Sequence, residues 1–249
     1  MYRVNELRGT KYDFVLLLRH FDYRHEKKSV DFTLLNDFEV DWTDSTGMRR
    51  IIPRADTSRN SIRCTIQRIM RSADPDDKIV FFFGGHGEYA EVNMMGLQVG
   101  ENSDFQCIIA GDGQRIYGKE LRSWFCDARY PSVAVTTVFD ACHSGGSLGL
   151  HISYDIKGQI VKASNGSRKR VRLPMIQISA SQPHEVAYSN NFNDGFYGQL
   201  TYSLLEYLKG TECPTTEGLV MYLKNCDPTG AQVPQVCSSR KIKGRIALF

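Results

Sequence analysis

The sequence predicts an α/β fold in three layers, with a mostly parallel sheet sandwiched between helices. Apolar runs of strand-like composition, such as 78–83 and 133–139, alternate along the chain with segments whose apolar residues have helical spacing. The 249 residues, of which 41% are hydrophobic and 24% charged, suffice for one domain with a large core. We find no repeats and expect a single domain over 1–249.

The elements follow from local composition. Residues 13–25 carry apolar side chains at 14–18 and 21, which predicts a helix packed on the sheet, and Thr57 or Ser58 can cap a second helix. The predicted helices are 13–25, one after residue 58 with apolar positions at 62, 66, 69 and 70, 120–126, 198–208 and 215–226. The predicted strands are 38–42, 78–83, 107–110, 133–139 and 175–180. Residues 88–104, rich in Gly, Asn and Glu, predict a surface loop.

Two of the apolar strands end on reactive residues inside Gly-rich turns. The first runs into His86, and the second runs into Cys142. The carboxyl ends of adjacent parallel strands meet at one edge of a sheet, so His86 and Cys142 should lie together. A cysteine nucleophile needs a nearby base, and His86 can act as the base and then as the acid for the leaving amine. The backbone N–H groups of Gly87 and Cys142 are the candidates for an oxyanion hole.

Each residue alone has a simpler interpretation. A single cysteine at a strand end is usually a small buried apolar residue, and a lone histidine is usually structural. The joint pattern favours catalysis. His143, directly after the cysteine, is the rival base, but we expect its side chain to point away.

The segments 83–87 and 140–145 resemble the His-Gly and Asp-x-Cys-His-Ser-Gly signatures of metacaspases and other caspase-fold cysteine peptidases. Asp140 gives the metacaspase form, because animal caspases have Gln-Ala-Cys at this place. Leu7–Asp13, Gly198–Glu206 and Gln232–Val236 are similar to further metacaspase segments, so the resemblance spans nearly the whole chain. It implies a caspase-like fold, a cysteine endopeptidase and a role in programmed cell death.

The resemblance also implies a two-part organisation. The large-subunit part would cover about 1–160 and the small-subunit part about 173–249, joined by a basic connecting loop over 157–172. This loop is either a solvated connector or a processing linker. In the second case, the candidate self-cleavage sites are the basic residues Lys162, Arg168, Lys169, Arg170 and Arg172.

Asp13 and Asp140 match the acidic floor of the metacaspase substrate pocket. Two carboxylates facing one guanidinium make charge-assisted contacts, so the resemblance implies cleavage after Arg or Lys. Thr10 stands where many metacaspases have Cys, which should change the pocket only modestly.

The resemblance makes calcium an open alternative, but the expected site looks degenerate. Gly118 and Lys119 stand where the family has an Asp-Asp pair before Glu-Leu. A calcium ion needs several oxygen ligands and Lys119 would repel it. Asp104 and Asp112 remain as weak candidate ligands, and we expect no metal or cofactor.

Charge and cysteine content restrict the other function classes. A net charge of +3 is too small to argue for a nucleic acid or a membrane as partner, and no apolar run reaches the length of a membrane span. Seven cysteines without metal-binding spacing predict free thiols in a reducing compartment. The start of the sequence does not look like a signal peptide. We expect a cytoplasmic monomer that acts on proteins or peptides.

Two other functions compete with the endopeptidase. The first is a catalytically inactive caspase-like scaffold. Only six residues precede Leu7, where the family has a central strand, and this favours the scaffold, whereas His86 and Cys142 favour the enzyme. The second is an acyltransferase or hydrolase with the same residue pair, for which no cofactor motif is present.

Overall fold

The computed structural model describes residues 7–24, 31–44, 46–89, 106–154, 160–162, 171–192, 195–212, 214–226 and 230–241. Its helices are α1 (Arg8–Arg24), α2 (Arg59–Ser72), α3 (Gly118–Phe125), α4 (Gln199–Gly210) and α5 (Thr216–Asn225). Its strands are β1 (Val40–Thr43), β2 (Arg49–Ile52), β3 (Lys78–Gly84), β4 (Gly87–Tyr89), β5 (Gln106–Ile109), β6 (Arg115–Tyr117), β7 (Ala134–Asp140), β8 (Ile152–Tyr154), β9 (Ile160–Lys162), β10 (Met175–Ser179), β11 (Ser189–Phe192), β12 (Gly195–Gly198) and β13 (Gln235–Ser238).

The main sheet has the strand order β3-β7-β10-β13-β8-β9. Strands β3, β7 and β10 pair in parallel, and β13, β8 and β9 then follow in antiparallel pairings. Strand β8 therefore points the same way as β3, β7 and β10, while β13 and β9 run opposite to them. The sheet is mostly parallel in strand direction, as predicted.

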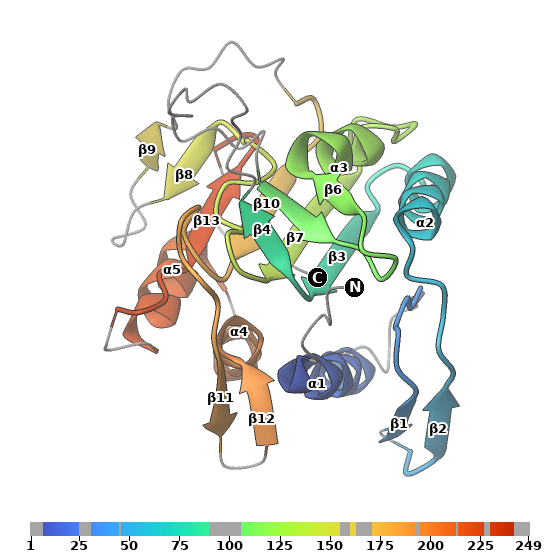
Figure 1. Cartoon of the computed structure of the whole chain (residues 1–249). Helices are drawn as coiled ribbons and strands as arrows, with labels where there is room; N and C mark the ends of the chain where they lie inside the picture. The colour runs from blue at the N-terminus through green and yellow to red at the C-terminus, as the bar shows by residue number, and fades with distance from the viewer. Residues whose placement is uncertain are drawn as a thin grey trace.

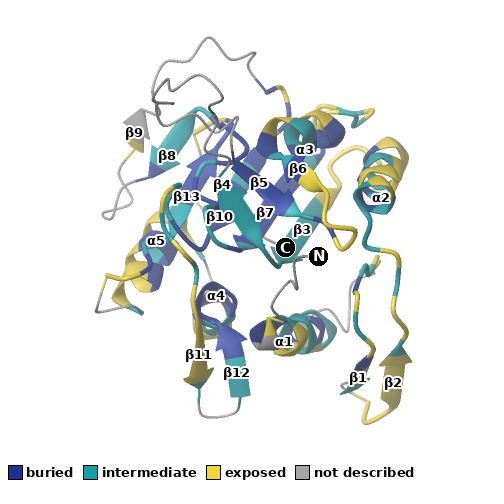
Figure 2. Ribbon diagram, viewed as in Figure 1, coloured by how far each residue is buried: buried dark blue, intermediate teal, exposed yellow. Residues whose placement is uncertain are grey.

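Helices cover both faces of this sheet (Figure 1). On one face, α2 and α3 pack on β3 and β7 through a core that includes Ile66, Phe125 and Phe139. On the other face, α4 and α5 pack with α1 through a second core that includes Leu204 and Leu219. Figure 2 shows the buried residues concentrated in the sheet and on the inner sides of the helices. The predicted three-layer α/β fold is confirmed.

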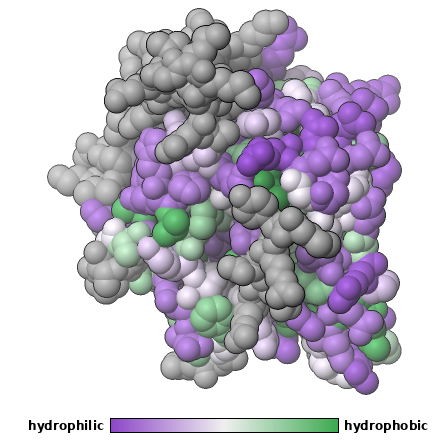
Figure 3. Space-filling view, in the orientation of Figure 1, coloured by the Kyte–Doolittle hydropathy of each residue, from purple (hydrophilic) through white to green (hydrophobic). Residues whose placement is uncertain are grey.

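Helix α2 illustrates how the sequence produces this arrangement. The Ser58 side chain accepts a hydrogen bond from the Ser61 N–H (3.3 Å), which caps the helix at its first turn. Ile62, Ile66 and Met70 recur at intervals of four residues and are all buried. The opposite side of the helix is polar, and the part of the surface that α2 forms is hydrophilic (Figure 3).

In the described part of the chain, three smaller sheets accompany the main one. β1 pairs with β2, β11 pairs with β12, and β4, β5 and β6 form a three-stranded antiparallel sheet between the β3 and β7 segments of the chain. The prediction of a surface loop over 88–104 is wrong for Glu88 and Tyr89, which belong to β4; residues 90–104 lie outside the described residues.

The prediction of a loop over 157–172 is also wrong for residues 160–162. Ile160–Lys162 forms β9 and pairs with β8 at the end of the main sheet. Ile160 and Val161 are β-branched and favour a strand, although the charged residues around them are typical of a loop.

Among the described residues, no helix is both long enough and apolar enough to cross a membrane.

Candidate active site

Strands β3 and β7 bring the two predicted catalytic residues to the same edge of the sheet. Their parallel register pairs Gly84 with Asp140, so His86 and Cys142 each follow two residues beyond this last pair. The Gly85 N–H donates to the Asp140 carbonyl at 3.3 Å, which continues the contact past the strand ends. The turn that carries His86 and the turn that carries Cys142 therefore lie next to each other.

Gly87 lies directly against the nucleophile's backbone. A Cβ atom at this position would overlap the Cys142 carbonyl oxygen, so only glycine permits the approach. The Ile109 N–H donates to the His86 carbonyl at 2.9 Å, which makes residues 86 and 109 a hydrogen-bonded pair of the β4–β5 ladder. The next pair, Gly87 with Ile108, is then a non-hydrogen-bonded pair, and the Gly87 N–H points away from β5.

The sulfur of Cys142 is in contact with the segment that follows β10. The Ala187 N–H donates to Sγ at 3.3 Å, and Sγ lies 3.8 Å from the Ala187 carbonyl oxygen. An N–H donor aimed at the sulfur is placed to stabilise a thiolate. Cys142 is partly exposed and is one of six described cysteines, all of which are free thiols.

His143 adopts a backbone conformation that is unusual for a residue with a side chain. Its φ is 54°, in the left-handed region, and its N–H donates to the Glu185 carbonyl at 2.9 Å. Its ring Nδ1 lies 3.0 Å from the Pro183 carbonyl oxygen. The ring of the rival base is thus directed toward residues 183–185.

The two predicted specificity carboxylates meet at the beginning of α4. The Gly198 N–H donates to Asp13 Oδ1 at 2.8 Å, and Thr201 donates to Asp140 Oδ2 from both its N–H (2.9 Å) and its hydroxyl (2.6 Å). A Cβ atom at Gly198 would overlap the Asp140 carboxyl and lie 3.0 Å from Asp13 Oδ2. The absence of a side chain at Gly198 lets both carboxyl groups approach the same point.

This crowding changes the titration of both acids. Burial, together with the neighbouring Asp140 charge, raises the pKa of Asp13 to about 8, although the Gly198 N–H acts in the opposite direction. Burial also raises the pKa of Asp140, against the two bonds from Thr201. The Asp13 side chain is only 3% exposed, so a negative charge there is costly unless a cation is present.

The supporting residues Thr201 and Ala187 could not be recognised from the sequence. Both are ordinary residues in a helix and a loop, and their importance follows only from the distances to Asp140 and Cys142. Gly198 carried a usable signal, since the predicted helix 198–208 begins on it and a glycine permits close approach to the backbone.

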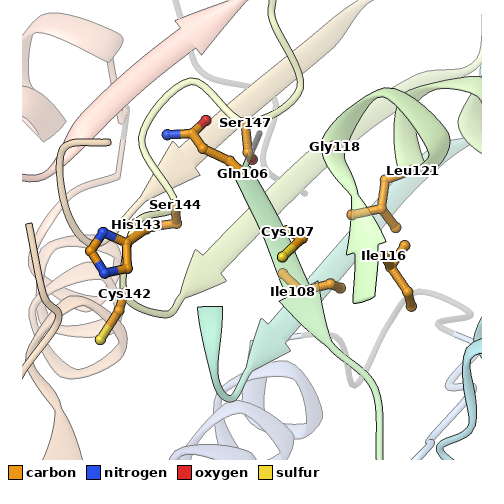
Figure 4. A pocket seen from close by; sticks show the side chains of 10 residues that line it. All are labelled: Gln106, Cys107, Ile108, Ile116, Gly118, Leu121, Cys142, His143, Ser144 and Ser147. Atoms are coloured by element: carbon orange, nitrogen blue, oxygen red, sulfur yellow. The ribbon is translucent and has the colours of Figure 1, made fainter. Parts of the chain in front are cut away.

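A small cavity lies beneath the turn that follows Cys142 (Figure 4). Its free volume is about 10 Å³, far below the roughly 300 Å³ at which small-molecule sites begin. Gln106, Cys107 and Ser147 are among its lining residues. Because it is so small, the cavity is a gap in the packing under the turn rather than a substrate pocket.

Several predicted positions are not brought into this site. Asp112 binds the backbone N–H of Arg59 (3.3 Å) and both the N–H and the side chain of Gln114 (3.1 and 3.0 Å). Both of its oxygens thus accept hydrogen bonds from residues at this turn and at the start of α2. Among the described residues, no group of three or more His, Cys, Asp or Glu side chains could hold a metal ion.

The candidate self-cleavage sites lie partly outside the described residues. Arg168, Lys169 and Arg170, like Asp104, lie outside the described residues. The backbone of Lys162 is paired in β9, and Arg172 is exposed.

The chain is similar to known proteins of one peptidase family. The family model described as "Metacaspase, peptidase C14 domain" matches residues 2–151. Metacaspase-1 of Kluyveromyces lactis is 31% identical over 166 residues, which cover 65% of this chain and 34% of that protein. Metacaspase-1 of Yarrowia lipolytica is 32% identical over 164 residues, which cover 65% of this chain and 32% of that protein.

A solved structure supports the fold. The crystal structure of a protein from Geobacter sulfurreducens matches with a TM-score of 0.54 and 16% identity, over 82% of this chain and 78% of that one. The sheet, the paired strand ends and the family match together define a peptidase domain of class C14. Within that class, the chain belongs to the metacaspase family. The match spans about a third of the length of these two Metacaspase-1 relatives.

Proposed function

We propose that the protein is a cysteine endopeptidase that cleaves peptide bonds after Arg or Lys by means of Cys142 and His86. The observation that carries this proposal is the β3–β7 register, which puts both residues two positions beyond the same strand pair. The acidic pair lies in the same region, because Asp140 is both the last residue of β7 and the second residue before Cys142.

His86 would take the proton from the Cys142 thiol, and the thiolate would attack the scissile carbonyl carbon. The N–H groups of Gly87 and Cys142 would stabilise the resulting oxyanion. His86 would then give its proton to the leaving amine, which leaves a thioester on Cys142. A water molecule activated by His86 would hydrolyse the thioester and restore the thiol.

The acidic pair would select the residue before the scissile bond. Asp13 and Asp140 converge on one point at Gly198, where a guanidinium or ammonium group would relieve the repulsion between them. Loss of Asp140 should weaken binding of the basic side chain by roughly 2–5 kcal/mol if the contact excludes water.

The reaction should not require calcium. Asp112 uses both of its oxygens locally, and Lys119 adds a positive charge to the expected site. We therefore expect equal activity with added calcium and with a chelator.

We further propose that the protein is a monomer that acts on proteins or peptides in the cytoplasm and has a role in programmed cell death.

The deciding experiment compares fluorogenic peptides that end in Arg, Lys or Asp. The proposal requires fast turnover of the first two and slow turnover of the third. An Asp140→Ala protein should lose this preference, whereas an Asp127→Ala protein, changed at a surface aspartate near α2, should keep it. A preference for Asp would refute the acidic pocket. Failure of both turnover and labelling by an Arg-directed thiol-reactive probe would instead favour the inactive scaffold.

A further inference from the structure

The turn that follows the nucleophile is held from below by buried glutamine side chains. We propose that Gln177 is a positioning residue, which fixes the conformation of residues 142–148 and thereby the placement of the Cys142 thiol and N–H. This inference rests on the proposed function of Cys142, but its main test does not depend on peptide cleavage.

Gln177 uses both ends of its amide on this turn. Its Nε2 donates to the Ser144 carbonyl at 2.8 Å and lies 3.2 Å from the Ser147 hydroxyl, and its Oε1 accepts from the Leu148 N–H at 3.0 Å. Gln177 projects from β10 and is 0% exposed, so these bonds face no competition from bulk water. A group that can both donate and accept is required at this position.

Two neighbours complete the support. Ser179, also on β10, donates to the same Ser144 carbonyl at 3.0 Å. From the other side, Gln106 of β5 donates to the Gly145 carbonyl at 2.7 Å and is 1% exposed. Figure 4 shows the Gln106 amide directed at the turn that carries Ser144 and Ser147. Two consecutive carbonyls of the turn are thus fixed by side chains from two different sheets.

The turn needs this support because its conformation is unfavourable by itself. His143 has a positive φ, which a residue with a Cβ adopts only when its surroundings impose it. His143 lies between the nucleophile and Ser144, the residue whose carbonyl Gln177 and Ser179 hold. Release of Ser144 would let His143 relax toward a more favourable conformation and rotate the peptide unit that joins it to Cys142.

The test uses Gln177→Met, which keeps the volume but removes both hydrogen-bonding groups. Thr137→Val is the matched control, because Thr137 is the equally buried cross-strand neighbour of Gln177 on β7, and its hydroxyl bonds to the Ile176 carbonyl (3.2 Å) and not to a residue of the turn. We expect Gln177→Met to lower kcat by roughly 10- to 100-fold with KM within about threefold, since a small misplacement of reacting atoms has effects of this size. Thr137→Val should leave both constants near those of the unmodified protein.

A second readout is the rate at which iodoacetamide alkylates Cys142, which reports on the thiol even if no peptide is cleaved. Gln177→Glu adds a pH test. Its protonated carboxyl can replace the amide as both donor and acceptor, but its ionised form cannot donate to Ser144. The alkylation rate of Gln177→Glu relative to the unmodified protein should therefore fall as pH rises, while the ratio for Gln177→Met should stay low at every pH.

The outcomes separate the two proposals. An unmodified protein that cleaves no peptide contradicts the proposed function, but the alkylation series still tests the positioning role. If Gln177→Met does not fold, the pH dependence of Gln177→Glu and the kinetics of Gln106→Met decide. Alkylation ratios near one at all pH values, or equal losses in the Gln177 and Thr137 variants, overturn the role of Gln177.

Discussion

The carboxyl group of Asp13 is buried beside that of Asp140, and it carries a proton over most of the neutral pH range because its pKa is raised to about 8. In the unfolded chain the same group ionises near its ordinary pKa of 3.8. At this group the folded state therefore binds more protons than the unfolded chain between these two values, so the contribution of Asp13 to stability falls as pH rises across this interval. The contribution of Asp13 is complete below about pH 4 and is lost as pH passes through about 8.

This titration predicts that Asp13→Asn stabilises the protein in a pH-dependent way. The amide cannot ionise, and its oxygen can still accept from the Gly198 N–H. The gain in melting temperature should be small near about pH 5 and large near about pH 9, measured by thermal unfolding. Asp127→Asn, at an exposed ion pair, serves as the control. A gain in melting temperature of equal size at both pH values would show that the gain does not come from the titration of Asp13.

The two histidines near Cys142 should differ in their effect on activity. His86→Ala and Cys142→Ala should each abolish peptide hydrolysis, because the first removes the base and the second the nucleophile. His143→Ala should retain more activity, since its ring bonds to the Pro183 carbonyl. Initial rates with an Arg peptide measure the difference, with far-UV circular dichroism to confirm folding. Full turnover by Cys142→Ala would exclude the assignment.

Among the helices, α2 depends on Ser58 for its first turn. Ser58→Ala removes the acceptor of the Ser61 N–H and should lower the free energy of unfolding by about 0.5–2 kcal/mol. Activity per folded molecule should not change, because α2 packs on the far side of β3 from α1 and the acidic pair. Urea unfolding measures the loss, and Ser72→Ala at the other end of the helix should have a smaller effect. Equal effects at both ends would argue against a specific cap.

The sequence predicts the long elements well because their apolar residues form either a continuous run, as in the strands, or a series with helical spacing, as in α2. β3 contains the apolar run 79–83, β7 is buried continuously over 135–139, and Ile62, Ile66 and Met70 mark the buried side of α2. The strands that the sequence does not reveal are short, and some are polar. β11 reads Ser189-Asn190-Asn191-Phe192, which has low strand propensity, so its pairing with β12 depends on the tertiary context.

The residues of the site also fall into two groups, those that can be recognised from the sequence and those that cannot. The residues with distinctive chemistry, such as His86, Cys142 and the two aspartates, can be recognised from motifs and strand ends. The groups that orient them are ordinary residues, and their roles depend on contacts between positions far apart in the chain. Thr201 is 61 residues from Asp140, and Gln177 is 33 residues from Ser144. No local pattern encodes such distances.

For the whole molecule, the basic segment 157–172 predicts slow self-cleavage. The purified protein should yield two fragments, with new N-termini after Lys162, Arg168, Lys169, Arg170 or Arg172. Cleavage after Lys162 should be the slowest, because the backbone there is paired in β9 and a protease needs an extended, accessible chain. Gel electrophoresis and N-terminal sequencing identify the sites.

The Cys142→Ala protein is the control for this prediction and should stay whole. If the active protein also stays whole while it cleaves peptides, the segment is only a solvated connector. If both proteins are cut equally, a contaminating protease is responsible.

The strand order of the main sheet has a consequence for the products of such a cut. Strands β7 and β8 precede the segment, and β10 and β13 follow it, yet the order is β7-β10-β13-β8. The second fragment would thus be inserted between two parts of the first, with a strand of the first fragment on each side. Separation would require the loss of both the β7–β10 and the β13–β8 pairings. The cut protein should therefore migrate as one particle in gel filtration, and the two halves, produced as separate polypeptides, are suited to reassembly as a split enzyme.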